Sequence, residues 1–244
     1  MNLRLRVLDP DPSAPFPPVE TAFDEPDGLL ATGGDLTPLR LLNAYRHGIF
    51  PWFSEGQPIL WWSPDPRTVF RTDGVHLSSR FRRGLRGSTW EVRADTVFDA
   101  VVRACAEAPR VGQGGTWITD GMREAYAALH RLGHAHSVEV FDGELLIGGI
   151  YGVAIGRMFF GESMFSARSG GSKTAIAALA YRLRTWGWPL IDAQVANDHL
   201  ASLGAESWSR TRFTRTIAGL TEQPGWSGRW TEPFGRLPAR MLAG

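Results

Sequence analysis

The chain has 244 residues, of which 43% are hydrophobic and 21% charged, and its formal net charge is +1. This composition is typical of a globular protein with one large or two smaller domains and excludes an intrinsically disordered chain. A single cysteine, Cys105, excludes an internal disulfide, and no apolar run is long enough to span a bilayer. We therefore expect a cytoplasmic protein without a membrane segment, and the near-zero net charge gives no sign of nucleic-acid binding.

Residues 1–65 are predicted to form a small N-terminal domain. Within it, residues 10–34 are rich in proline, glycine and acidic residues and predict turns rather than a regular element. Residues 38–47 predict a helix, since proline is allowed in its first turn and a glycine follows its last residue. Residues 49–67 are aromatic and interrupted by prolines, so we expect them to pack against, or open toward, a larger domain at 66–244.

In the second domain, strands and helices alternate. The predicted elements are a strand at 90–93, helices at 96–108 and 119–132 joined by a glycine-rich loop at 109–118, strands at 135–141, 144–155 and 157–166, a helix at 173–186, a strand at 189–195, a short helix between Asn197 and Gly204, and a strand near 206–214. This order predicts an α/β (α+β) fold and resembles the GNAT-type acyltransferase fold, a mixed sheet that splays beside its fourth and fifth strands. Residues 218–244 are weakly patterned, and we expect them to wrap the surface.

The strongest candidate site lies on two neighbouring predicted strands. Glu162 falls where a buried strand favours an apolar residue, and strand alternation places Asp192 and Gln194 on one face, roughly 7 Å apart. This is the end of the sheet at which open α/β folds bind ligands. Proximity of the two acids would raise the pKa of one carboxyl, which suits base chemistry. A structural polar network is the alternative interpretation, and the pattern alone does not separate the two.

Other motifs give weaker signals. Residues 166–173, SARSGGSK, could bind phosphate at a helix N-terminus, but they match neither a P-loop nor the pyrophosphate loop of GNAT acetyltransferases, which favours a turn. His130, His134 and His136 straddle a predicted helix end, so we expect structural roles and no metal site. The sequence lacks G-x-S-x-G, and Cys105 lies on the apolar face of a predicted helix, so a covalent nucleophile is not indicated.

Across nearly its whole length the sequence resembles the bacterial leucyl/phenylalanyl-tRNA–protein transferases. The resemblance is carried by long strings, among them EPDGLLATGGDL at 25–36, WWSPDPR at 61–67, GTWIT at 115–119, GESMFS at 161–166 and LIDAQVANDHLASLGAE at 190–206. Members move leucine or phenylalanine from aminoacyl-tRNA to proteins with N-terminal arginine or lysine, which creates a degradation signal. The resemblance implies a GNAT-like domain, no cofactor, and aminoacyl-tRNA and acceptor proteins as partners, and we expect a monomer.

The resemblance also assigns roles to positions in this chain. The residues of the mechanism fall on Asp192, Gln194 and Glu162. The aromatic residues near the terminal adenosine of the tRNA fall on Trp52 and Trp117. The residues of the pocket for the aminoacyl side chain fall on Phe159, Met164 and Ile191, with Ile150 and Ile176 nearby. The cysteine common between the aspartate and the glutamine is Ala193 here, which argues against a nucleophilic cysteine at that position.

A basic patch lies outside this candidate site. Residues 78–86 contain four arginines, Arg80, Arg82, Arg83 and Arg86, and no acidic residue. Because 25 of the 26 basic residues are arginine and Lys173 is the only lysine, the arginines by themselves say little. The resemblance implies that this patch contacts acceptor-stem phosphates, which position a nucleic acid without reading its sequence.

The expected chemistry needs neither ATP nor metal, because an aminoacyl ester is already activated. The enzyme must orient the ester and the amine, remove a proton and stabilise an oxyanion. Gln194 can orient the amine, while Asp192 either polarises Gln194 and the amine or takes the proton. The 2′-hydroxyl of the terminal ribose could also carry this proton. Glu162 suits the cationic side chain or the ammonium group of the acceptor, and methionine is expected to be a weak donor.

Two other functions stay open at this point. A coenzyme A-dependent acetyltransferase would use the same fold, although the pyrophosphate loop is missing. A binding module for N-terminal basic residues would use Glu162 and Asp192 only as anionic contacts.

Overall fold

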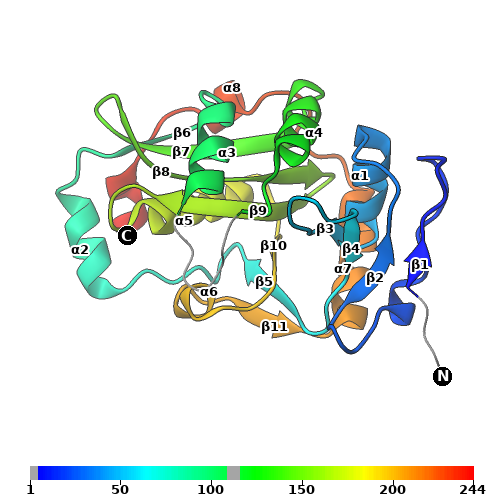
Figure 1. Cartoon of the computed structure of the whole chain (residues 1–244). Helices are drawn as coiled ribbons and strands as arrows, with labels where there is room; N and C mark the ends of the chain where they lie inside the picture. Colours follow the sequence, from blue (N-terminus) through cyan, green and yellow to red (C-terminus); the bar gives the residue numbers. More distant parts are fainter. Residues whose placement is uncertain (1–4, 109–115) are drawn as a thin grey trace.

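The computed structural model describes residues 5–108 and 116–244, which form a smaller and a larger sheet (Figure 1). The smaller sheet has the order β1-β2-β4-β3, with β1 at Arg6–Val7, β2 at Leu29–Thr32, β3 at Phe50–Pro51 and β4 at Leu60–Trp62. The short 3-10 helix η1 (Val19–Thr21) and helix α1 (Pro38–Arg46) complete this part. The prediction of α1 is confirmed. The prediction of turns is wrong at β2, because Leu30 and Ala31 are buried and β2 pairs with β4.

The larger sheet contains, among the described residues, eight strands in the order β11-β5-β10-β9-β8-β7-β6-β12. Their bounds are β5 Arg67–Arg71, β6 Glu91–Ala94, β7 Ala135–Asp142, β8 Leu145–Ile155, β9 Met158–Ser166, β10 Leu190–Gln194, β11 Glu206–Trp208 and β12 Leu237–Pro238. Strands β9 and β10 run parallel, but only residues 158–160 pair with residues 190–192. The other neighbours in this sheet, as far as the described residues go, are antiparallel. The predicted GNAT-like mixed sheet is therefore confirmed, and it splits between β9 and β10.

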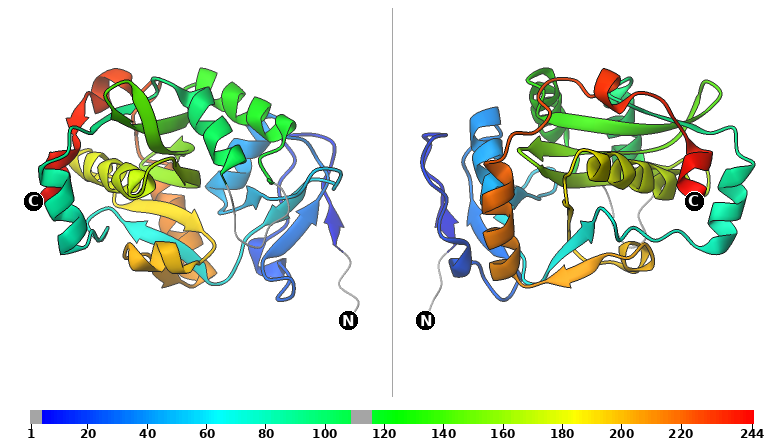
Figure 2. Two further views of the ribbon diagram at one scale, coloured as in Figure 1. Left: turned by 60° about the vertical axis from the view of Figure 1, so that its left-hand side comes forward. Right: turned by 180° about the vertical axis from the view of Figure 1, so that it is seen from behind.

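Helices cover both faces of the larger sheet (Figures 1 and 2). One face carries α3 (Phe98–Glu107), α4 (Asp120–Arg131) and α7 (Arg210–Thr221), and the other carries α5 (Gly171–Thr185) with α2 (Ser79–Arg86) and η2 (Ala239–Ala243). The first face also receives the N-terminal part, whose Tyr45 and Trp61 share a buried cluster with Val153 of β8 and with Cys105. The chain changes sheets between Trp62 and Arg67, and a domain boundary at residue 65 stays a prediction.

From β6 to β11 the elements follow the predicted order, including α6 (Asp198–Ser202), which Asn197 caps as expected. The predicted loop at 109–118 lies mostly outside the described residues. None of the helices in the described part of the chain is long and apolar enough to cross a membrane.

The predicted last strand is wrong beyond Trp208. Helix α7 starts at Arg210 instead, after Ser209, whose hydroxyl accepts a hydrogen bond from the Arg212 backbone N–H. A hydroxyl at this position satisfies a free amide of the first helical turn. The buried residues of α7 are Phe213, Ile217 and Leu220, which are spaced as one face of a helix.

Some of the C-terminal residues belong to the core, so the prediction that residues 218–244 wrap the surface is wrong for these, whereas residues 222–229 are exposed. Trp230 and Phe234, at the start and end of the turn that forms α8 (Thr231–Phe234), are fully buried, and β12 pairs with β6. The Trp230 backbone N–H donates to the Asp95 carboxylate at 2.7 Å, and its ring stacks on His136 with centroids 4.0 Å apart. A few large side chains anchor this segment without any sequence periodicity that could predict it.

Trp230→Ala should lower the free energy of unfolding by about 3–5 kcal/mol, because it leaves a large cavity in a packed core. Urea denaturation measures the loss. Trp226→Ala is the control, because Trp226 is 50% exposed and surface substitutions usually change stability by less than about 0.5 kcal/mol. If Trp230→Ala and Trp226→Ala lowered the free energy of unfolding equally, Trp230 would not be part of the core.

Candidate active site

Glu162 lies on β9 just beyond the residues that pair with β10. Tyr151 pairs with Ser163 and Gly152 with Gly161, so Glu162 is the extra residue of a β-bulge. The extra residue of a bulge has no partner in the ladder, and Phe160 and Glu162 both contact Tyr45, so they lie on one face of β9. The Glu162 side chain meets Tyr45 of α1 and Tyr126 of α4, and the residue is 8% exposed.

The Glu162 carboxyl group accepts hydrogen bonds from three side chains. The Tyr45 hydroxyl donates to Oε1 at 2.7 Å, the Gln194 amide Nε2 donates to Oε1 at 3.0 Å, and the Tyr126 hydroxyl donates to Oε2 at 2.5 Å. The two tyrosine oxygens are themselves 2.7 Å apart. Glu162 and Gln194, predicted as site residues, are therefore in direct contact, and the two tyrosines join them.

Burial raises the pKa of Glu162 to about 7. The hydrogen bonds from Tyr126 and Tyr45 oppose the rise, the charge of Asp192 adds to it, and the charge of Arg67 opposes it. The sequence predicts a raised pKa from the proximity of two acids, but loss of hydration is the larger cause. Burial also raises the pKa values of both tyrosines well above 10, and the charge of Glu162 adds to this.

Asp192 is fully buried and forms an ion pair with Arg67, a residue that sequence reasoning missed. Arg67 Nε donates to Asp192 Oδ1 at 2.8 Å, and Nη2 donates to Oδ2 at 2.6 Å. Arg67 Nη1 donates to the Gly48 carbonyl at 3.0 Å, and the guanidinium lies 4.7 and 4.6 Å from the ring centroids of Phe50 and Phe213. An arginine at the start of the apolar strand Arg67–Arg71 was the signal that could have found this pair.

Gln194 has a backbone φ of 60°, in the left-handed region that non-glycine residues rarely adopt. Its backbone N–H donates to Asp192 Oδ1 at 3.0 Å, and the pairing of β10 with β5 shifts register between the two residues. The predicted alternation across Asp192 and Gln194 therefore does not hold. The Asp192 side chain meets Arg67 and the Gln194 side chain meets Glu162, and the strained conformation, which costs on the order of 1–3 kcal/mol, is held by the buried pair.

The residues predicted for the acyl pocket lie in one apolar cluster. Ile150 pairs with Met164 across β8 and β9, and Ile191 pairs with Phe159 across β10 and β9. Ile176 of α5 joins them, and Met164 is the partly buried member. All five residues thus belong to one buried cluster, in which Met164 pairs with Ile150 and Phe159 with Ile191.

Gly161 lies beside this cluster and close to the backbone of β10. A Cβ atom at Gly161 would lie 4.0 Å from Ile150 Cδ1 and from Ile191 Cγ2, and 3.0 Å from the Asp192 carbonyl oxygen. A glycine inside a strand is typical of a place that a ligand or another backbone approaches closely. Glycine here avoids a close contact with the Asp192 carbonyl at the point where β9 and β10 separate.

Trp52 and Trp117, predicted to lie near the terminal adenosine, line the same groove of about 1150 Å³. The groove lies between the smaller sheet and the start of α4, and Trp62 also lines it. The Trp62 indole N–H donates to the Trp52 carbonyl, and the two rings are 5.7 Å apart. The aromatic walls are thus fixed before any ligand binds.

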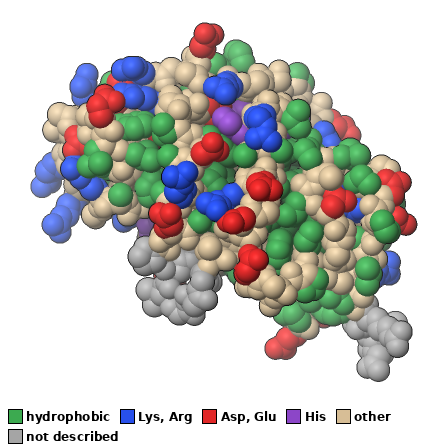
Figure 3. Space-filling view, turned by 45° about the horizontal axis from the view of Figure 1, so that its top comes forward, with side chains coloured by type: hydrophobic (Ala, Val, Ile, Leu, Met, Phe, Trp, Pro, Cys, Tyr) green, Lys and Arg blue, Asp and Glu red, His purple; other side chains and the backbone are tan. Residues whose placement is uncertain are grey.

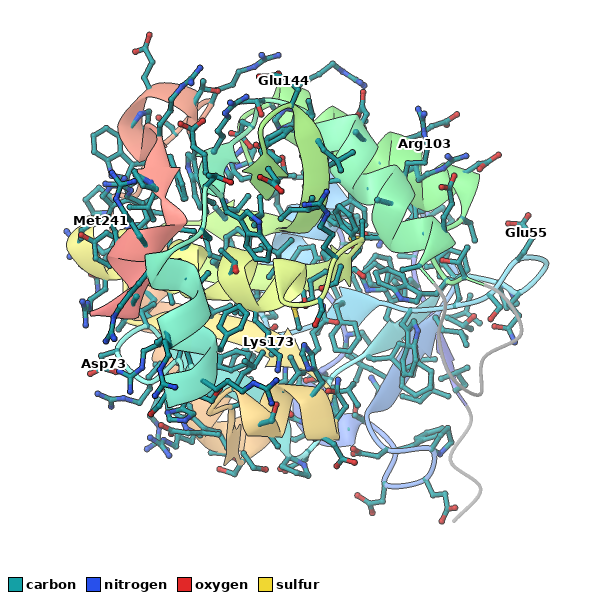
Figure 4. The ribbon with its side chains drawn as sticks, turned by 90° about the vertical axis from the view of Figure 1, so that its left-hand side faces the viewer. Glu55, Asp73, Arg103, Glu144, Lys173 and Met241 are labelled. Carbon is teal, nitrogen blue, oxygen red and sulfur yellow. The ribbon has the colours of Figure 1, made fainter. Side chains whose placement is uncertain are left out.

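The basic patch forms helix α2, which Ser78 caps by accepting from the Phe81 backbone N–H. Arg80, Arg83 and Arg86 are exposed, whereas Arg82 donates to the carbonyl of Gly244 at 3.2 Å. A cavity of about 380 Å³ lies against α2, and its lining includes Arg80 and Lys173. In Figure 3 basic side chains lie at the end of the molecule that carries α2 and also in the middle of the same face, and Figure 4 shows Lys173 near α2.

Two of the three grouped histidines approach one acid, since His130 Nδ1 lies 3.9 Å and His136 Nδ1 2.8 Å from the Asp95 carboxylate. His130 Nδ1 is 2.8 Å from the Ala135 carbonyl and its ring stacks on Phe98, whereas His136 Nδ1 is 2.8 Å from Asp95. The structural role expected for these histidines stays a prediction. In residues 5–108 and 116–244 no three histidine, cysteine or acidic side chains are grouped so that they could hold a metal ion.

Comparison with known proteins gives a consistent match. The family model described as leucyl/phenylalanyl-tRNA protein transferase matches residues 69–218, and the model of its N-terminal domain matches residues 34–65. The leucyl/phenylalanyl-tRNA–protein transferase of Xanthomonas euvesicatoria pv. vesicatoria is 70% identical over 233 residues, which cover 94% of this chain and 93% of that protein. The transferase of the same name from Xylella fastidiosa is 64% identical over 242 residues, 99% of this chain and 100% of that protein. Among solved structures, L-PGS from Bacillus licheniformis is 12% identical, with a TM-score of 0.35 over 79% of this chain and 64% of that chain.

Proposed function

The chain belongs to the leucyl/phenylalanyl-tRNA protein transferase family, and from this premise we propose how its residues carry out the reaction. It is an aminoacyltransferase that moves leucine or phenylalanine from aminoacyl-tRNA to the α-amino group of proteins with N-terminal arginine or lysine, and so makes a degradation signal. This activity takes precedence over the acetyltransferase and the binding module. The observation that carries the proposed mechanism is the contact between Gln194 Nε2 and Glu162 Oε1 at 3.0 Å, where β9 and β10 separate.

The incoming amine binds between Glu162 and Gln194. A carboxylate has about four acceptor positions, and the three donors to Glu162 leave one for an N–H of the amine. Within the described residues no donor reaches the amide oxygen of Gln194, so this oxygen can accept a second N–H. Two acceptors in fixed positions aim the nitrogen lone pair at the ester, which is the orientation effect that transfer requires.

Asp192 acts as a positioning residue for Gln194. Both of its carboxylate oxygens accept from Arg67, and the residue is fully buried, which supports a fixed role over proton transfer. Its bond to the Gln194 N–H holds the left-handed backbone that turns the amide toward Glu162.

The aminoacyl-tRNA occupies three regions that the described residues provide. Its amino-acid side chain enters the apolar cluster beside Gly161, its terminal adenosine lies against Trp52 and Trp117, and its backbone phosphates contact α2. The contiguous apolar cluster, the shared groove and the exposed arginines support these three placements. We also propose that the enzyme acts as a monomer.

Neutralising the ion pair tests whether Asp192 positions Gln194 or takes the proton. The double variant Arg67→Gln/Asp192→Asn should keep transfer within about tenfold, because the introduced amide oxygen still accepts the Gln194 N–H and no charge is left unpaired. Loss of a general base lowers the rate by about 10²-fold or more. A loss of that size in a folded double variant would mean that Asp192 takes the proton. Single-turnover transfer and the melting temperature are measured together. Asp192→Asn alone should be less stable by about 3–5 kcal/mol, because it leaves Arg67 buried and unpaired.

Gly161→Ala should narrow the acyl pocket. One methyl group in an apolar pocket changes discrimination by roughly 10–200-fold, so kcat/KM for leucyl- and phenylalanyl-tRNA should fall at least tenfold relative to norvalyl-tRNA, whose side chain is smaller. Ile150→Val removes the Cδ1 atom that lies 4.0 Å from the new methyl group but not the closer contact with the Asp192 carbonyl, so adding it to Gly161→Ala should restore part of the original ratio. An equal loss with all three donors, without rescue, would mean that Gly161 does not border the pocket.

The exposed arginines of α2 should determine the salt dependence of tRNA binding. In Arg80→Gln/Arg83→Gln/Arg86→Gln, the slope of log affinity against log salt should become shallower by about 0.7–0.9 for each lost phosphate contact. The control is Arg103→Gln/Arg131→Gln, which removes exposed arginines from α3 and α4 and should leave the slope unchanged. If the triple variant and the wild type had the same slope, the tRNA phosphates would not contact α2.

A further inference from the structure

Glu162, Tyr45 and Tyr126 form a closed ring of three oxygen contacts. The hydroxyl of Tyr45 is 2.7 Å from Glu162 Oε1, the hydroxyl of Tyr126 is 2.5 Å from Oε2, and the hydroxyls are 2.7 Å from each other. Each of these separations is within hydrogen-bond range for O–H···O. A complete ring therefore needs three hydrogens, one for each contact.

Two tyrosine hydroxyls supply only two hydrogens. When Glu162 is ionised, both hydroxyls donate to the carboxylate, and no hydrogen lies between the two tyrosine oxygens. When Glu162 is protonated, its O–H donates to Tyr126, Tyr126 donates to Tyr45, and Tyr45 donates back to Oε1. Both tyrosines are fully buried, and a buried polar contact without a hydrogen is unfavourable. The ring is thus complete only when it holds one extra proton.

We propose that this ring is the proton acceptor of the transfer reaction: Glu162, held by Tyr45 and Tyr126, takes a proton from the ammonium group of the acceptor protein. The inference rests on the proposed function, which places the amine against Glu162 and Gln194. It assigns Tyr45 and Tyr126 a part in the chemistry, and it assigns proton uptake to Glu162 rather than to Asp192.

The protons balance over the reaction. The acceptor ammonium gives one proton to the Glu162 carboxylate, which leaves a neutral amine and a closed ring. The amine nitrogen attacks the ester carbonyl, the C–N bond forms, and the bond from the carbonyl carbon to the ribose oxygen breaks. The second proton of the nitrogen goes to that departing oxygen, directly or through the neighbouring ribose hydroxyl. Glu162 releases its proton to water after the products leave.

The proton affinity of Glu162 is matched to this task. A free α-amino group has a pKa of about 7.7–8.0, and an ordinary glutamate with a pKa of about 4.3 would accept its proton several thousandfold less readily, on the order of 10³–10⁴, than a group with a matched pKa. Burial raises the pKa of Glu162 to about 7. The titratable groups that surround it are Tyr45, Tyr126 and, behind Tyr126, Tyr151, together with the opposed charges of Asp192 and Arg67.

Two acceptors test the proposal with Glu162→Gln. One is a peptide that begins with arginine, and the other is the same peptide with an aminooxy group in place of the α-amino group, which is neutral at pH 7. Transfer to the amine at pH 7 should fall by about 10²-fold, the scale of general-base loss, and the deficit should shrink as pH rises and free amine accumulates. Transfer to the aminooxy peptide should stay within a few-fold of wild type, because no proton has to be removed before attack.

Two tyrosine variants keep the carboxyl group and open the ring. Tyr45→Phe and Tyr126→Phe should each reduce the rate of transfer to the amine by about tenfold and the rate of transfer to the aminooxy peptide by a few-fold at most. Neither variant should change the affinity for leucyl-tRNA. Tyr181→Phe, on α5 and outside the ring, is the matched control and should behave as wild type. Thermal melting shows that each variant is folded.

The outcomes separate the inference from the proposed function. If Glu162→Gln loses equally with both peptides at every pH, Glu162 only anchors the acceptor, and the ring is not the proton acceptor. If Glu162→Gln loses nothing with either peptide, the amine does not bind at Glu162, and the proposed placement fails with the inference. If Glu162→Gln slows transfer to the amine more than transfer to the aminooxy peptide, but Tyr45→Phe and Tyr126→Phe do not, the Glu162 carboxyl group accepts the proton without help from the ring.

Discussion

The buried ion pair between Arg67 and Asp192 is the contact on which the rest of the site depends. It joins β5 to the end of β10, and through the Gly48 carbonyl and the Phe213 ring it also touches the chain after α1 and helix α7. Two opposite charges removed from water are stable only when their remaining hydrogen-bonding groups are satisfied, and here the N–H of Gln194 satisfies one of them. The fold therefore fixes the backbone of Gln194 by the same contacts that hold the sheet together.

Two irregularities in the sheet create the site, and neither follows from periodicity. The bulge at Glu162 and the left-handed residue Gln194 lie on neighbouring strands just where these strands stop pairing. Regular alternation would place the Gln194 side chain on the face of Asp192, whereas its left-handed backbone turns the amide toward Glu162, which the bulge leaves without a partner on β8. The irregular backbone lets the Glu162 and Gln194 side chains contact each other. The parallel pairing of residues 158–160 with residues 190–192 holds the two strands together beside this contact.

Sequence patterns predicted much of the fold but only half of the site. The alternation of apolar residues gave the order from β6 to β11, because each of those elements has one buried face. The prediction failed at α7, although its buried residues are spaced as one face of a helix, and at Trp230, where a few large residues pack without regular spacing. Glu162 and Gln194 were predicted because a polar residue in an apolar strand is unusual, and the resemblance agreed. Arg67, Tyr45 and Tyr126 were missed, because each is an ordinary residue in its own segment and acquires its role from partners 36 to 125 positions away.

The order of strands in the larger sheet has a consequence for how the protein is made. Strand β5 lies between β10 and β11, so a ribosome must synthesise more than a hundred further residues before β5 finds either neighbour. Until then Val69 and Phe70, both buried in the finished protein, have no sheet to join, and an unpaired apolar strand invites pairing with other chains. Pairings between distant segments also slow folding. The nascent chain is therefore most exposed to aggregation while residues 72 to 189 are being added, and the active site is assembled only at the end of that interval.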